Sequence, residues 1–74
     1  MAKAFIGNIE CQVTVDKDLG DSWAIAVVPP APSHRGERSL PTLVVKLQGE
    51  DTEKITKGAL EILQQRGQID RFEL

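Results

Sequence analysis

Hydrophobic and polar residues alternate most clearly near the start of the chain, from residue 5 to residue 16. Asn8, Glu10, Gln12, Thr14 and Asp16 form the polar parity. The apolar parity holds Phe5, Gly7, Ile9, Cys11, Val13 and Val15. A period of two residues is typical of a β-strand with one buried and one solvated face. The pattern predicts one strand over residues 5–16 in a two-layer domain.

A second strand is predicted over residues 23–28, after a polar turn at residues 17–22 that contains Gly20. The short link favours an antiparallel hairpin with the first strand. This second strand has no strongly polar side. One side carries Trp23, Ile25 and Val27, and the other carries Ala24, Ala26 and Val28.

Residues 29–41, with the sequence PPAPSHRGERSLP, contain all 4 prolines of the chain. Proline has no N–H group to donate to a strand ladder, and it restricts the residue before it to extended backbone. We predict a long loop here, and we expect residues 30–40 to lack regular structure and to show fast backbone motion.

The rest of the chain predicts a third strand over residues 42–48, a helix and a short last strand over residues 69–74. Asp51 or Thr52 is the expected N-cap of the helix, and Gly67 is its expected C-terminal cap. We therefore predict one α+β domain over residues 1–74, of order β-β-β-α-β, with one sheet and a single amphipathic helix packed on one face. Its expected core is Ile9, Val13, Val15, Ile25, Val27, Leu43, Val45, Leu47, Ile55, Ala59, Ile62 and Leu63.

Composition narrows the class of protein. The chain has 74 residues, a net charge of -2 and 4% aromatic residues, so the core must be mainly aliphatic. A nucleic-acid-binding domain usually shows a clear basic excess, which is missing here. The N-terminus lacks the apolar core of a signal peptide, and the longest apolar run, residues 23–32, is too short to span a bilayer. We expect a cytoplasmic protein without a membrane segment.

Side chains that could carry chemistry are few and isolated. His34 is the single histidine and lies in the proline-rich loop, without the orienting carboxylate that a catalytic histidine needs. Cys11 lies on the apolar parity of the first strand, where a thiol is usually unreactive. No nucleophile motif, glycine-rich phosphate loop or Cys/His metal cluster is present. We predict no catalytic residue, no cofactor and no metal site.

The second strand favours association of the chain with another protein or with a second copy of itself. One helix covers only one face of a sheet, so apolar residues on both sides of this strand leave a surface for a partner or a second copy, unless the loop folds back over it. We predict a small non-enzymatic protein-binding module, an accessory or regulatory subunit that acts through the open sheet face, the sheet edge and the loop. Pro29 and Pro32 also match a PxxP ligand pattern. The candidate partner-binding residues are Trp23, Ala24, Ala26, Val28, Pro29, Pro32, Arg35 and Arg38.

An alternative is a small nucleic-acid-associated regulator that uses Arg35, Arg38, Lys46 and Lys3. Residues 15–29, VDKDLGDSWAIAVVP, resemble the opening hairpin of HicB-type antitoxins in their acidic turn and in a strand that ends in proline. The predicted order of elements is also similar to theirs. The glycine-rich stretch that usually follows that hairpin is replaced here by the proline-rich loop. The resemblance implies an antitoxin-like regulator.

Overall fold

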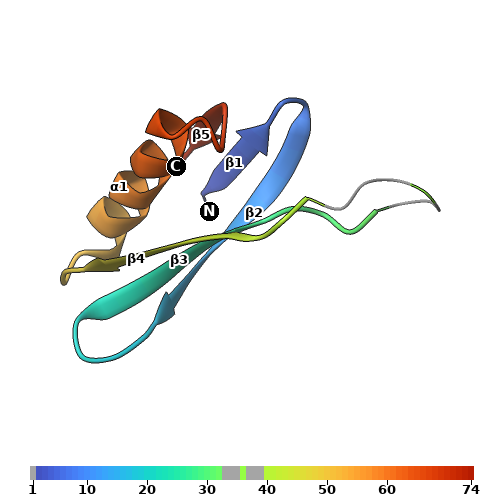
Figure 1. The fold of residues 1–74 in the computed structure, drawn as a ribbon. Helices are drawn as coiled ribbons and strands as arrows, with labels where there is room; N and C mark the ends of the chain where they lie inside the picture. Colours follow the sequence, from blue (N-terminus) through green and yellow to red (C-terminus); the bar gives the residue numbers. More distant parts are fainter. Residues whose placement is uncertain (1, 33–35, 37–39) are drawn as a thin grey trace.

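The computed structural model describes residues 2–32, 36 and 40–74, and it consists of one antiparallel sheet and one helix (Figure 1). The predicted two-layer α+β architecture is confirmed. Within the described residues the sheet has 5 strands in the order β4-β3-β2-β1-β5. The elements are β1 (Lys3–Ile6), β2 (Ile9–Lys17), β3 (Ser22–Val28), β4 (Leu43–Gln48), α1 (Thr52–Gln65) and β5 (Arg71–Glu73).

The prediction of one long first strand is wrong, because this segment forms a hairpin of two strands, β1 and β2. Gly7 and Asn8 form its two-residue turn, and Ile6 pairs with Ile9. Gly7 has a φ of +60°, the backbone conformation that a type II′ turn requires at its first position. The turn reverses the parity, so β1 places Ala4 in the core, and Phe5 lies on the opposite face.

Capping hydrogen bonds define both ends of helix α1. The Asp51 carboxylate accepts hydrogen bonds from the backbone N–H groups of Glu53 at 3.1 Å and Lys54 at 3.4 Å. At the other end Gly67 has a φ of +74°, and the Gln68 N–H donates to the Leu63 carbonyl at 2.9 Å. This is a Schellman motif, which stops a helix and satisfies its last carbonyls. Both predicted caps are thus confirmed, Asp51 being the N-cap.

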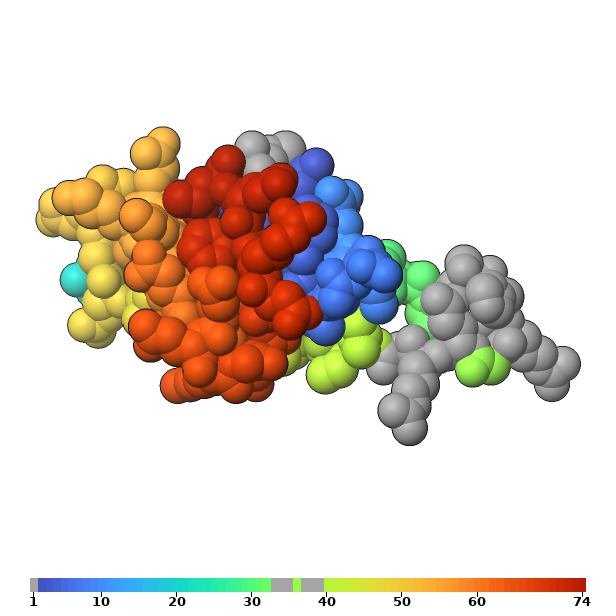
Figure 2. All heavy atoms as spheres, turned by 90° about the horizontal axis from the view of Figure 1, so that it is seen from above, coloured from blue at the N-terminus to red at the C-terminus, as the bar shows by residue number. Residues whose placement is uncertain are grey.

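The helix carries the chain from one edge of the sheet to the other. Because every pair of neighbouring strands is antiparallel, β4 and β5 run in the same direction at opposite edges. Figure 2, seen from the helix side, shows α1 and the C-terminal segment (orange to red) lying over the sheet beside β1 (blue). The Asp70 N–H donates to the Phe5 carbonyl at 2.8 Å, and the Asp70 carboxylate accepts from the N–H of Gly7. These bonds fasten β5 to the β1–β2 hairpin.

The core lies between α1 and the central strands. The prediction was wrong for Ile9, which is 40% exposed because it follows the turn. Five other expected core residues are only partly buried: Val13, Val15, Leu43, Leu47 and Ile62. The buried hydrophobic residues are Ala4, Cys11, Ile25, Val27, Val45, Ile55, Ala59, Leu60, Leu63 and Ile69.

The proline-rich loop leaves the sheet at the end of β3 and returns to it at β4 (Figure 1). Its described residues, at positions 29–32, 36 and 40–42, carry no helix or strand. Residues 33–35 and 37–39 lie outside the described part, and so do the candidate residues Arg35 and Arg38. The expected fast backbone motion stays a prediction.

Candidate partner-binding surface

The face of the sheet turned away from α1 is here called the open face. Ile25 and Val27 are fully buried on the helix side of β3. Since side chains alternate along a strand, Ala24, Ala26 and Val28 lie on the open face, each of them half-buried. Val44 of β4 pairs with Ala26 and is 54% exposed. We call these four residues, Ala24, Ala26, Val28 and Val44, the open-face patch.

Polar residues border the open-face patch along β2. Ala24 pairs with Asp16, Ala26 with Thr14, and Val28 with Gln12. The partner strand therefore offers a carboxylate, a hydroxyl and an amide in successive rows. Among the described residues of the sheet, the apolar side chains on this face lie on β3 and β4, apart from the Phe5 ring on β1.

Charged pairs occupy the far side of the open face, on β1, β2 and β5. The Lys3 ammonium lies 3.2 Å from the Glu10 carboxylate, and the Arg71 guanidinium lies 3.3 Å from that of Glu73. The Arg71 guanidinium also lies 3.9 Å from the centroid of the Phe5 ring and covers it. The part of the open face on β1, β2 and β5 is therefore mostly charged and solvated.

Lys46 borders the open-face patch on β4, opposite Ala24. Its ammonium lies 3.7 Å from the Asp18 carboxylate, on side chains that are 66% and 40% exposed. Lys46 and Lys3, the two members of the alternative basic patch that the structure describes, thus each have an acidic neighbour. They also lie on strands separated by β2 and β3.

Within residues 2–32, 36 and 40–74, the outer edge of β4 presents backbone groups that are not paired with another strand. The Gly49 N–H donates to the Asp21 carbonyl at 3.0 Å, so residue 49 bonds toward β3. Because bonding direction alternates in an antiparallel ladder, Leu43, Val45 and Leu47 also bond toward β3. The N–H and C=O groups of Val44, Lys46 and Gln48 therefore point away from the sheet. We call this row the β4 edge.

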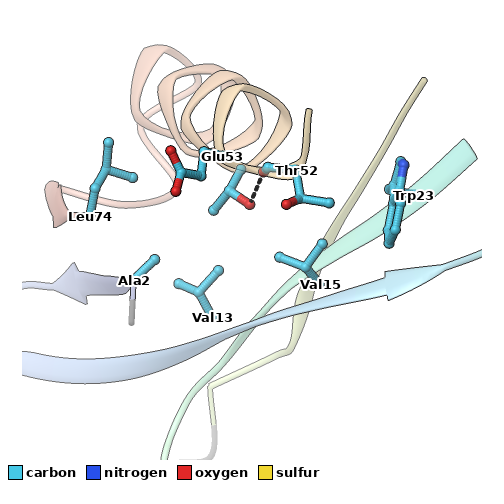
Figure 3. Close-up of a pocket in the computed structure, with 8 residues that line it drawn as sticks. Ala2, Val13, Val15, Trp23, Thr52, Glu53 and Leu74 are labelled. Atoms are coloured by element: carbon cyan, nitrogen blue, oxygen red, sulfur yellow. Dashed lines mark hydrogen bonds between the residues drawn. The ribbon is translucent and has the colours of Figure 1, made fainter. Parts of the chain in front are cut away.

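Trp23 lies on the helix side of the sheet, apart from the open-face patch. Its indole N–H donates to the Gly49 carbonyl at 2.9 Å. The ring forms one end of a groove of about 610 Å³ between α1 and β2, into which Val13 and Val15 point (Figure 3). The other lining residues are Ala2, Thr52, Glu53, Thr56 and Leu74. The candidate residues predicted from the second strand therefore divide between two faces.

The chemical groups in the described part of the chain are sparse. Cys11 is 1% exposed, and burial raises the pKa of its thiol, so the thiolate is disfavoured. Among residues 2–32, 36 and 40–74, no three His, Cys, Asp or Glu side chains lie close enough together to hold a metal ion. No helix within these residues has the length and apolarity to cross a bilayer.

Comparisons of the chain with protein-family models, with curated proteins and with solved structures found no match.

Sequence reasoning missed Val44, and it named a sheet edge as part of this surface without identifying the strand, β4, that forms it. Val44 shares its parity with Thr42, Lys46 and Gln48, so a single exposed valine among polar neighbours was visible in the sequence. The β4 edge was not visible, because strand order depends on long-range pairing.

Proposed function

We propose that this protein is a non-enzymatic protein-binding module, an accessory or regulatory subunit that docks on its partner through the open-face patch. The observation that supports this most is the contrast within one face. Ala24, Ala26, Val28 and Val44 are apolar and reachable, whereas the β1, β2 and β5 positions of the same face are mostly polar or charged.

The cost of leaving this area in water argues for a partner. Apolar surface that stays exposed forgoes roughly 25 cal/mol for each Å², and a domain of this size has only a few kcal/mol of net stability. On β2 the residues that face outward are polar: Gln12, Thr14 and Asp16. On β3 the residues that face outward are apolar, so part of their apolar surface stays in water.

The shape of the open-face patch indicates what it would accept. Ala24 and Ala26 have short side chains, so the backbone or a large side chain of a partner can approach the sheet closely. Asp16 and Lys46 flank Ala24 on either side. A suitable partner surface therefore has an apolar centre with polar groups of both signs at its rim, as protein interfaces commonly do.

The test is a quantitative pull-down of partners from an extract of the host with tagged wild-type protein and two variants. Ala26→Glu places a carboxylate in the middle of the open-face patch. Gln65→Glu adds the same charge on the exposed end of α1, in the opposite layer. We expect Ala26→Glu to lose the captured partner and Gln65→Glu to keep it, with both variants melting cooperatively. Equal capture by Ala26→Glu and the wild type would contradict the proposal.

Salt separates this proposal from the nucleic-acid alternative. Contacts to phosphates weaken steeply as the salt concentration rises, whereas apolar docking does not. We expect the captured partner to be a protein that stays bound in high salt. Nucleic acid that is released by salt would favour the alternative instead.

A further inference from the structure

The two edges of the sheet are protected to different extents. β5 is 3 residues long and has Arg71 and Glu73 at its ends, features that prevent a strand from pairing with another chain. β4 is 6 residues long, contains no proline and has one charged residue, Lys46. That charge has Asp18 as a neighbour on its own subunit. Of the two sheet edges in the described part of the chain, the β4 edge is therefore the one open to pairing.

We propose that a second copy of this chain pairs its β4 edge with the first, antiparallel and about a two-fold axis, so that the two sheets become one continuous sheet. An antiparallel strand is complementary to itself: each outward N–H meets an outward C=O when the strand is turned by two-fold rotation. This inference goes beyond the proposed function, because the second copy occupies the β4 edge and leaves the open-face patch available to a partner. A second copy also matches the side chains of β4 better than an arbitrary extended peptide would.

The side chains select the register of this pairing. If the axis passes Lys46, the two lysines lie directly opposite each other, which is unfavourable for like charges. If it passes Val45, each Lys46 lies opposite the partner's Val44. On the helix side of the sheet, Val45 then meets the partner's Val45, and Leu43 meets the partner's Leu47. The second register pairs more apolar side chains and separates the lysines, so the structure favours an axis at Val45.

The pairing would cover residues that the single chain leaves half exposed. Leu43 and Leu47 are partly buried on the helix side, and each would gain a leucine neighbour across the axis. Val44 lies at the edge of the open-face patch, so the two patches would become neighbours on one continuous face. A dimer would thus offer a partner a docking surface twice as large.

The first test is the mass in solution by sedimentation over a wide concentration range. Val44→Pro removes an N–H group of the β4 edge without removing a bond to β3, since that N–H points outward. Val44→Thr keeps the N–H and the branched shape. We expect a dimer for the wild type and for Val44→Thr, and a monomer for Val44→Pro. A monomeric wild type, or a dimeric Val44→Pro, would overturn the inference.

The second test determines the pairing register of the two β4 strands, and it does not depend on the proline variant. In a Cys11→Ser background, Val45→Cys and Lys46→Cys are oxidised separately. With the axis at Val45, the paired Cα atoms at position 45 are about 4.5 Å apart, whereas those at position 46 are about 9 Å apart, beyond disulfide reach. We expect Val45→Cys to cross-link and Lys46→Cys to stay monomeric on a denaturing gel. Cross-linking of Lys46→Cys alone would refute this register.

Ala26→Glu separates this inference from the proposed function. Because Ala26 lies on the open face and not on the β4 edge, we expect this variant to stay dimeric while it loses the captured partner. A monomeric Ala26→Glu would show that copies associate through their faces, which would refute edge pairing and leave face docking intact. A dimeric Ala26→Glu that keeps its partner would refute the docking proposal and leave edge pairing intact.

Discussion

Replacing Gly58 by alanine should stabilise the protein. Gly58 lies in the middle of α1, half-buried above β4. A glycine there costs conformational entropy on folding, which alanine would reduce. An added Cβ at this position would lie 3.8 Å from Cδ1 of Leu47, an ordinary van der Waals contact, so the methyl group of alanine fits between the helix and the sheet.

The size of the effect follows from these two terms. The change from glycine to alanine in a helix interior is worth about 0.5 to 1 kcal/mol. The new methyl group adds a smaller gain by its contact with Leu47. We therefore expect the free energy of unfolding of Gly58→Ala to rise by about 1 kcal/mol, which corresponds to about 4 to 8 °C in Tm for a domain of this size.

Gly67→Ala is the matched control, because the same atoms are added at a backbone position with a φ of +74°. A side chain there costs about 1 to 2 kcal/mol of left-handed strain, so Tm should fall. Urea denaturation followed by the fluorescence of Trp23 measures both changes, with the slope m as a check that the transition is unchanged. Destabilisation by Gly58→Ala would mean that α1 packs closer to β4 than the structure shows, and the reasoning would be refuted.

Three further predictions concern the core, a cap and the thiol. Leu60→Ala, at a side chain with 0% exposure, should cost about 2 to 5 kcal/mol, and the partly buried Ile62→Ala should cost less; the reverse order in urea denaturation would mean that α1 is rotated on the sheet. Asp51→Ala should cost about 1 kcal/mol through the lost N-cap bonds, measured as a lower Tm, whereas an unchanged Tm would argue against the cap. Burial raises the pKa of Cys11, so its contribution to stability is complete below the ordinary thiol pKa of about 8.5 and is lost as pH rises through the folded pKa. Between pH 7 and pH 10 the free energy of unfolding should therefore fall further for the wild type than for Cys11→Ser, and equal slopes would argue against this linkage.

The fold class could be predicted from the sequence because its signals are local. The period of β2, the cap at Asp51 and the glycine after α1 each act within a few residues. The β1–β2 hairpin was missed although Gly7 and Asn8 are typical of a two-residue turn. Hydrophobic and polar residues continue to alternate through the turn, although the inward positions change from even-numbered residues in β1 to odd-numbered residues in β2. Periodicity alone therefore does not distinguish one long strand from two short ones.

The candidate surface could be predicted only in part. That one trio of β3 would face away from the helix followed from side-chain alternation. Which trio it is, and the position of Trp23 on the helix side, depend on how α1 lies across the sheet. Leu60 was missing from the predicted core for the same reason. Packing against the strands determines how a helix is rotated about its own axis. Strand order, and with it the free edge of β4, depends on pairing between segments far apart in the chain.

The pairing of the first and last strands determines where attached material would sit. Lys3 and Glu73 are direct neighbours across β1 and β5, so the start of β1 and the end of β5 lie close together (Figure 1). They do so at the edge of the sheet farthest from β4. A tag or another domain joined to either end is therefore held away from β4. For the same reason, the unit can be inserted into a surface loop of a host protein with its entry and exit points adjacent.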